Sequence, residues 1–210
     1  MADPALRAAA DSIRSALAEN TESGSGGTDP VYATEREHFD GYTHQEIWDR
    51  VHEVIDPEAL GRAADAWRAG ADAIGEAFQA FSDAADHEFA RWSGRAADAA
   101  RQATREFVDA GGAAHDVCRA VQRLMELNRD AAQAIRAAIP PPGQYRPADD
   151  PVVETVLGGQ RRMDHDSAAA AAQADAQDTM TYVYTPTMPA SGDRVPRFTP
   201  RTTDPAGGRS

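Results

Sequence analysis

The sequence predicts an all-α fold, an elongated helical bundle built on one long antiparallel helical hairpin with a Trp-x-Gly turn. Much of the 41% hydrophobic content is alanine, which has the highest helix propensity. Leu, Ile, Val and Phe together make up about 14% of the chain, too little for a β-sandwich or a β-barrel. Two long segments also repeat small or apolar residues about every 3.5 positions, as helix–helix seams do.

The first part of the chain, residues 1–30, is expected to hold a short helix and a flexible linker. Apolar side chains recur at helical spacing over residues 4–20, and residues 23–27 contain only Ser and Gly. A helical domain is expected over residues 31–184. Its first helix should begin after Thr43, because Thr43 and Glu46 have the spacing of a capping box.

The hairpin is expected to consist of two helices, at about residues 57–89 and 95–139. Asp56 and Pro57 form a typical helix start, and the prolines at 140–142 cannot continue a helix. The short connection between the two helices makes them antiparallel. The expected seam positions are Leu60, Ala64, Trp67, Ala71, Ile74, Phe78, Phe81 and Ala85, then Ala96, Ala100, Ala103, Phe107, Ala110, Ala114, Val117, Val121, Leu124, Asn128, Ala131, Ile135 and Ala138.

The hairpin is not expected to form a core by itself. Most seam positions of its second helix are alanine, and burial of so small a side chain contributes little free energy. Further helices of this chain, or another chain, must cover the apolar stripe. Asn128 on the seam has two interpretations: a buried residue that sets the register, or an exposed one where the second helix extends beyond the first. Its position favours the second.

The region after the hairpin is expected to contain three parts. Residues 140–160 form a Pro-rich connection, a further helix follows at about 161–184, and residues 185–210 form a disordered Pro-rich tail. The large apolar side chains on or beside the seam are the candidate partner interface: Trp67, Phe78, Phe81, Phe107, Val108 and Met125.

The charge balance excludes several function classes. The chain carries 34 acidic residues against 21 basic ones, all of them Arg, and a formal net charge of −13. Such a chain is repelled by nucleic-acid phosphates and by anionic membranes. No apolar run is long enough to span a membrane, and the N-terminus has no secretory signal pattern, so we expect a cytosolic protein or one exported without a cleavable signal peptide.

No constellation in the sequence indicates an enzyme, a cofactor or a metal site. The single cysteine, Cys118, excludes an intramolecular disulfide and any zinc site built on several cysteines. The histidines at 44 and 52 and the Asp-His-Asp run at 164–166 lack the clustering of metal ligands. Nucleophile-elbow, metalloprotease, phosphate-loop and dinucleotide-binding motifs are all absent.

Trp92-Ser93-Gly94 lies at the expected turn of the hairpin, and with its surroundings resembles the WXG/PPE superfamily of type VII (ESX) secretion substrates from actinobacteria. The PPE-like branch is indicated by Asp56-Pro57 before an Ala-rich helix that carries Trp67, by the prolines that end the second helix, and by the late Pro196-Arg197-Phe198 run. The similarity covers roughly residues 40–200.

The resemblance implies a non-enzymatic protein that is exported folded and reaches the medium or the cell surface. Its export signal would combine Trp92 and Gly94 with a Tyr-x₃-Asp/Glu element, for which Tyr145 and Asp149 have the right spacing. Trp92 could also simply fill the turn, and the two roles are compatible. The implied partners are the secretion machinery and a small helical PE- or WXG-like protein. In some members an apolar tip binds a dedicated chaperone, and residues 156–157 are the faint counterpart here.

The alternative from a different class is a self-assembling structural protein whose helical faces stack into rings or filaments. In that case identical copies, rather than a second protein, would cover the apolar stripe.

Overall fold

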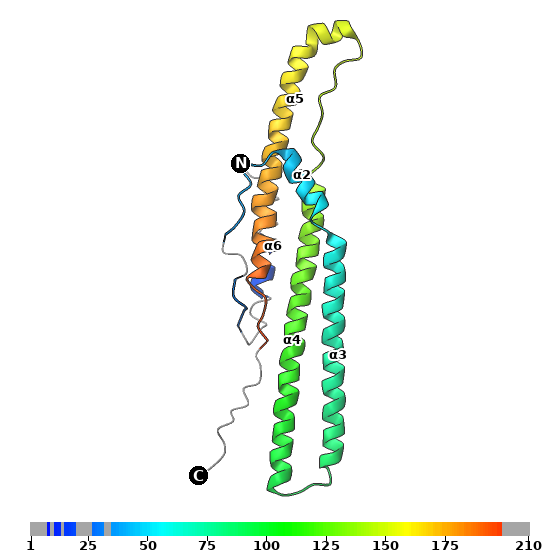
Figure 1. Cartoon of the computed structure of the whole chain (residues 1–210), viewed down its shortest axis with the longest axis vertical. Helices are drawn as coiled ribbons and strands as arrows, with labels where there is room; N and C mark the ends of the chain where they lie inside the picture. The colour runs from blue at the N-terminus through cyan, green and yellow to red at the C-terminus, as the bar shows by residue number, and fades with distance from the viewer. Residues whose placement is uncertain (1–7, 9–10, 14, 20–26, 32–34, 199–210) are drawn as a thin grey trace. The chain divides into compact units, whose positions relative to one another are not determined.

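Helices dominate the structure, a computed structural model that describes residues 8, 11–13, 15–19, 27–31 and 35–198. Four α-helices of ten or more residues lie in this part of the chain (Figure 1): α2 (His44–Glu53), α3 (Pro57–Phe89), α4 (Arg95–Ala138) and α5 (Pro151–Thr179). A π-helical turn η1 (Met180–Tyr184) and a short helix α6 (Thr185–Gly192) continue α5. The described residues between 8 and 19 are also helical, as the spacing over 4–20 predicts.

The chain divides into two compact units. Unit 1 comprises Met1–Ala16, Val31–Leu60 and Leu127–Gly192, and unit 2 comprises Leu17–Pro30, Gly61–Glu126 and Asp193–Ser210. The long helices α3 and α4 contribute to both units, so each unit is described by itself.

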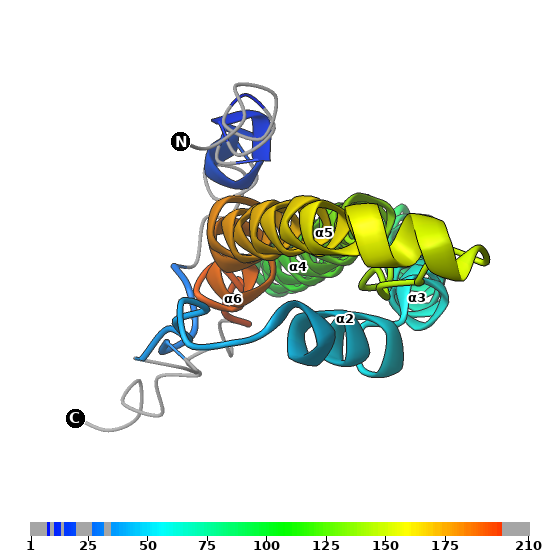
Figure 2. The same ribbon diagram turned by 90° about the horizontal axis from the view of Figure 1, so that it is seen from above.

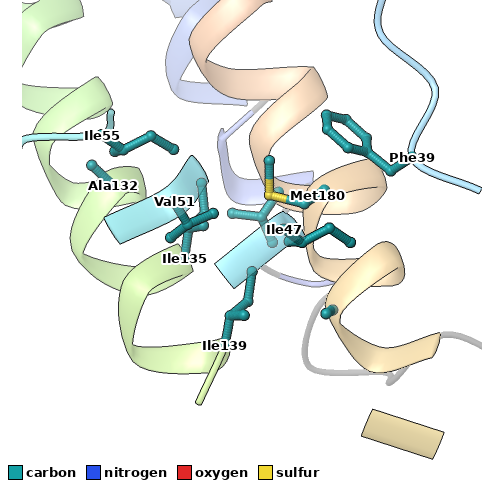
Figure 3. Packing of buried hydrophobic residues seen from close by; sticks show 10 residues of the cluster. Phe39, Ile47, Val51, Ile55, Ala132, Ile135, Ile139 and Met180 are labelled. Carbon is teal, nitrogen blue, oxygen red and sulfur yellow. The ribbon is translucent and has the colours of Figure 1, made fainter. Parts of the chain in front are cut away.

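Unit 1 contains the main hydrophobic core (Figure 3). The last turns of α4 and the helix α5 form an antiparallel hairpin, and α2 contacts α5 (Figure 2). Apolar side chains from α2, α4, α5 and η1 meet in one buried cluster with Phe39 from the segment before α2. The cluster consists of Phe39, Ile47, Val51, Ile55, Ala132, Ile135, Ile139, Ala176, Met180 and Val183.

Helix α2 begins and ends with side chains that satisfy its free backbone groups. Thr43 and Glu46 form the expected capping box at its start. At its end the Arg136 guanidinium donates to the carbonyls of Val51, His52 and Ile55, the last at 2.6 Å. Arg136 therefore ties the end of α2 to α4 and satisfies carbonyl groups that a helix end leaves without partners.

Helix α5 begins ten residues earlier than the sequence pattern predicts. The expected start at about Arg161 is wrong, and the helix begins at Pro151. Asp150 is its N-cap, with a carboxylate that accepts the Val152 N–H at 2.8 Å, and Pro151 occupies the first turn, where a missing N–H costs nothing. The Pro-rich connection is correspondingly shorter and covers residues 139–150.

The expected disordered tail from residue 185 is wrong over its first part, because Thr185–Gly192 is helical in spite of Pro189 inside it. Threonine hydroxyls donate to carbonyls of the preceding turn, Thr185 to Met180 and Thr187 to Val183. Thr187 and Ser191 are buried, so packing within unit 1 also stabilises this helix. Residues 199–210 of the expected tail lie outside the described residues.

Asn128 is buried, which contradicts the favoured exposed interpretation. Its side-chain amide donates to the Ser191 hydroxyl of α6 at 2.9 Å. The sequence could not predict this bond, because it joins residues 63 positions apart through a helix that was expected to be a tail.

Unit 2 contains the antiparallel pair formed by α3 and α4, with the helix ends that the sequence predicts to within one residue. The row of α4 that faces α3 agrees with the expected one in part, because the expected seam residue Phe107 contacts Phe78 and Phe81 of α3, but positions beside that row also face the partner helix. Gly111 lies against the Phe78 ring, His115 against Gly75, and Arg119 approaches Asp72 at 4.0 Å. The expected seam residues Ala103, Phe107 and Ala110 are exposed. In so Ala-rich a helix, periodicity does not identify which of two adjacent rows faces the partner.

A short pairing in unit 2 joins two segments that are distant in the sequence. Thr28 and Pro196 form an isolated antiparallel β-bridge, with Asp29 N–H to the Val195 carbonyl at 2.9 Å and Arg197 N–H to the Gly27 carbonyl at 3.0 Å.

Candidate interaction site

The connection between α3 and α4, residues 90–94, contains Trp92 and Gly94. The chain leaves α3 after Phe89, and the Trp92 N–H donates back to the Phe89 carbonyl at 3.0 Å. Gly94 has φ +92°, a value that side-chain-bearing residues rarely adopt, and its carbonyl accepts the Asp98 N–H in the first turn of α4. Gly94 thus allows the chain to reverse direction in five residues.

The Trp92 side chain is exposed, with 55% of its surface accessible. One edge of the indole contacts the Phe89 ring, at a centroid distance of 5.6 Å and an angle of 65°. The ring therefore does not plug the interior of the hairpin. An exposed tryptophan offers a large apolar surface with a hydrogen-bond donor, a combination enriched at protein–protein interfaces.

An apolar stripe lies on one side of α3 and α4 in unit 2 and is here called the hairpin face. Its rings Phe81 and Phe107 lie 5.3 Å apart, and Phe107 also lies 5.1 Å from the half-buried Phe78 of α3. Phe81 and Phe107 keep 43% and 42% of their surface exposed. The hairpin face consists of Ala63, Trp67, Gly70, Ile74, Ala77, Phe81 and Ala84 on α3 and Ala96, Ala103, Phe107 and Ala110 on α4.

The six candidate interface residues fall into two groups. Trp67, Phe81 and Phe107 are exposed on the hairpin face. Phe78, Val108 and Met125 are half-buried, and Phe78 packs against Gly111 inside the helix pair. The first group offers more exposed surface to another chain than the second.

Tyr145 and Asp149 lie in unit 1, in the non-helical connection before α5, whereas Trp92 and Gly94 lie in unit 2. The Tyr145 hydroxyl donates to a carboxylate oxygen of Glu154 at 2.8 Å, and its ring meets the His165 ring edge-on at 5.6 Å. Asp149 is exposed. Tyr145 is therefore held against α5 by its own contacts.

Glu154 anchors this connection to α5. Its second carboxylate oxygen accepts the Ala148 N–H at 2.8 Å, and Arg161 and Arg162 each approach the carboxylate at 3.5 Å. The Ala148 and Tyr145 hydrogen bonds hold the pKa of the Glu154 carboxyl below its usual value. No sequence motif had indicated Glu154, because its partners lie in a segment without regular structure.

The lowered pKa of Glu154 predicts a pH-dependent contribution to stability. This contribution is fully present above the unfolded-state pKa of about 4.3 and disappears as the pH falls through the lower folded-state pKa. Glu154→Gln should therefore lower the free energy of unfolding at neutral pH, and the difference from the wild type should shrink below about pH 4. Urea denaturation of both proteins at the two pH values measures this. Asp149→Asn, in the same connection, is the control and should change stability by less than about 0.5 kcal/mol.

A second exposed apolar group lies at the start of α5 in unit 1. Val152 and Val156, one helical turn apart, are exposed over 70% and 72% of their surface, and Val153 and Leu157 are exposed beside them. Of these four residues, the resemblance points only to 156–157. Starting the helix at Pro151 places all four on neighbouring positions of one helix.

Two findings bear on other kinds of site. No helix in the described part of the chain combines the length and apolarity needed to cross a bilayer. Within residues 35–198 and the shorter described stretches, no three His, Cys, Asp or Glu side chains are grouped as metal ligands would be. Cys118 is buried in α4, and burial raises the pKa of its thiol.

The fold defines an all-helical protein with long antiparallel helices and exposed apolar surfaces. Comparison of the chain with protein-family models, with curated proteins and with solved structures gives no match.

Proposed function

We propose that this chain is a non-enzymatic type VII secretion substrate or secretion-associated protein of the PPE-like kind. The observation that carries the proposal is the pair formed by Trp92 and Gly94: an exposed indole in the connection between two long antiparallel helices, followed by a glycine with positive φ. An export machine that binds folded helical proteins needs such a local, accessible feature. Trp92 and Gly94 serve as that recognition feature.

The partner of the chain is a small helical protein that covers the hairpin face. This surface exposes three large aromatic side chains, and apolar patches mark interaction sites. Because most of its other residues are alanine or glycine, a partner helix can approach closely and receive the aromatic rings. The exposed apolar residues at the start of α5 suit the dedicated chaperone that some members of the superfamily use.

Export from an actinobacterial host that has a type VII system tests the proposal. Trp92→Ala should lower the amount of the chain in the culture medium at least about tenfold, as loss of a central aromatic anchor does at other interfaces. The amount in the cytoplasm and the helical circular dichroism signal should stay unchanged, because the side chain is exposed. Arg91→Ala, one position earlier in the same connection, is the matched control and should be exported normally.

Equal export of the Trp92→Ala variant and the wild type would contradict the assigned role of Trp92. Tyr145→Ala is measured in the same assay because the Tyr145 side chain packs against α5, whereas the Trp92 side chain is mostly exposed. A loss of export with normal folding assigns Tyr145 and Asp149 to the signal, and unchanged export limits the signal to the α3–α4 connection.

Self-assembly is the second candidate function, favoured by the same exposed hairpin face, which a second copy could cover. Light scattering of the purified chain separates the two. A discrete large particle indicates self-assembly, whereas a monomer that forms a one-to-one complex with a small helical protein indicates a hetero-partner. In the first case Phe81→Ser should dissolve the particle, because it makes the centre of the face polar.

A further inference from the structure

The connection between α3 and α4 needs partners for its carbonyl groups. The last carbonyls of a helix have no N–H partner within the helix. Water, turns or side chains must donate to them instead. Here one side chain from the other helix does this. The Arg101 guanidinium donates through Nη2 to the Phe89 carbonyl at 2.6 Å and to the Trp92 carbonyl at 2.8 Å.

Arg101 is itself held in place. It lies in the second turn of α4, its side chain is 31% exposed, and its Nη1 contacts the Asp98 carboxylate at 3.3 Å. The planar guanidinium has several donors in a fixed geometry, which suits it to grip two carbonyls and a carboxylate together. A lysine ammonium at the same position has a different shape and cannot reproduce all three contacts.

The two carbonyls that Arg101 binds belong to residues whose side chains touch. Phe89 and Trp92 form the edge-to-face ring contact described above, so the same guanidinium fixes the backbone at both members of that pair. Gly94 permits the reversal of the chain but does not enforce it, because glycine populates many backbone conformations. The connection therefore needs a group that selects one of them.

We propose that Arg101 is the positioning residue that holds the α3–α4 connection in the conformation that presents Trp92. The role of Arg101 in export rests on the proposed recognition of Trp92. Its role in holding the connection rests only on the two carbonyl contacts. Arg101 acts through Trp92 and does not itself bind the export machine.

Hydrogen exchange followed by mass spectrometry tests the structural part in the full chain. Arg101→Ala should speed amide exchange in residues 90–94 at least about tenfold, because hydrogen bonds from a charged group to both carbonyls are lost. Arg101→Lys should give an intermediate rate. Arg105→Ala, one turn further along α4 and hydrogen-bonded to Gln102, is the matched control and should exchange like the wild type.

The thermal midpoint of the Arg101 variants should change by only a few degrees, since the contacts are local. Unchanged exchange over residues 90–94 in Arg101→Ala would overturn the inference. If Arg101→Ala lowers the thermal midpoint strongly, the exchange rates of Arg101→Lys and Arg105→Ala over residues 90–94 are compared instead. Arg101→Lys keeps most of the side chain, and Arg105→Ala leaves Arg101 in place.

Export measurements then separate this inference from the proposed function. Arg101→Ala should reduce export several-fold, with Arg101→Lys partly restoring it, while Trp92→Ala abolishes it. Normal export of Trp92→Ala refutes the proposed function and leaves the exchange result standing. Loss of export in Trp92→Ala together with normal export in Arg101→Ala refutes the positioning role alone.

Discussion

Replacing Gly111 with alanine is expected to destabilise the chain by about 1–3 kcal/mol, because the added methyl group overpacks the contact between α3 and α4. A Cβ atom built on Gly111 would lie 2.3 Å from Cγ and Cδ1 of Phe78. Cγ is the ring atom nearest the backbone, so a simple rotation of the ring cannot remove the clash. Either Phe78 must leave its position or the two helices must separate in unit 2.

The neighbouring glycine is the control for this experiment. A Cβ on Gly112 would meet nothing within 4 Å, and the residue is exposed on the same helix. Gly112→Ala should therefore stabilise the chain by about 0.5–1 kcal/mol, through the higher helix propensity of alanine. Urea denaturation followed by circular dichroism gives both values. A stabilising effect of Gly111→Ala would show that Phe78 does not pack against α4 at this position.

The second large effect is expected in the core of unit 1. Ile135 has no exposed surface and lies in the cluster between α2, α4 and α5 (Figure 3). Ile135→Ala should lower the free energy of unfolding by about 2–5 kcal/mol, because it removes buried methyl groups and leaves a cavity. The same denaturation experiment measures this loss.

Val156→Ala is the matched control for Ile135→Ala, since it also shortens a branched side chain on a helix of unit 1. Val156 is 72% exposed, so the expected change is within about 0.5 kcal/mol. Equal losses in the two variants would mean that the apolar group at the start of α5 is covered in solution, for example by self-association.

Part of the helical architecture was predictable because its signals are local. Asp56 accepts hydrogen bonds from the Glu58 and Ala59 N–H groups at the start of α3, as an N-cap does. Gly94 and the prolines at 140–142 mark the other ends of the hairpin helices. Caps, glycines and prolines act through their own backbone, so they can be recognised without knowledge of distant contacts.

Several of the errors involve contacts between residues far apart in the sequence, whereas the early start of α5 follows from the local cap formed by Asp150 and Pro151. Helix α6 was missed because its proline content opposes a helix, and what stabilises it is hydroxyl donation within the turn and burial against the rest of unit 1. Two expected seam residues of α4, Ala103 and Ala110, are exposed, because alanines on adjacent rows of a helix look alike in the sequence. Asn128 was expected to be exposed because its partner, Ser191, belongs to that missed helix.

The candidate site was predictable only in part. Trp92 and Gly94 stand out in the sequence as a tryptophan and a glycine between two heptad segments. Arg101 did not stand out, because arginines are frequent on exposed helix faces and its spacing from Trp92 has no local meaning. The contacts of Tyr145 with Glu154 and His165 were likewise invisible before the connection was seen against α5.

The ends of the hairpin helices could be predicted to within one residue, because backbone propensity and capping are properties of short segments. Only the tertiary structure decided which helix rows meet, which polar groups are buried, and which aromatic rings remain exposed. Those properties depend on packing between distant segments, as in α4, where Gly111 is buried against Phe78 while Phe107 beside it stays exposed.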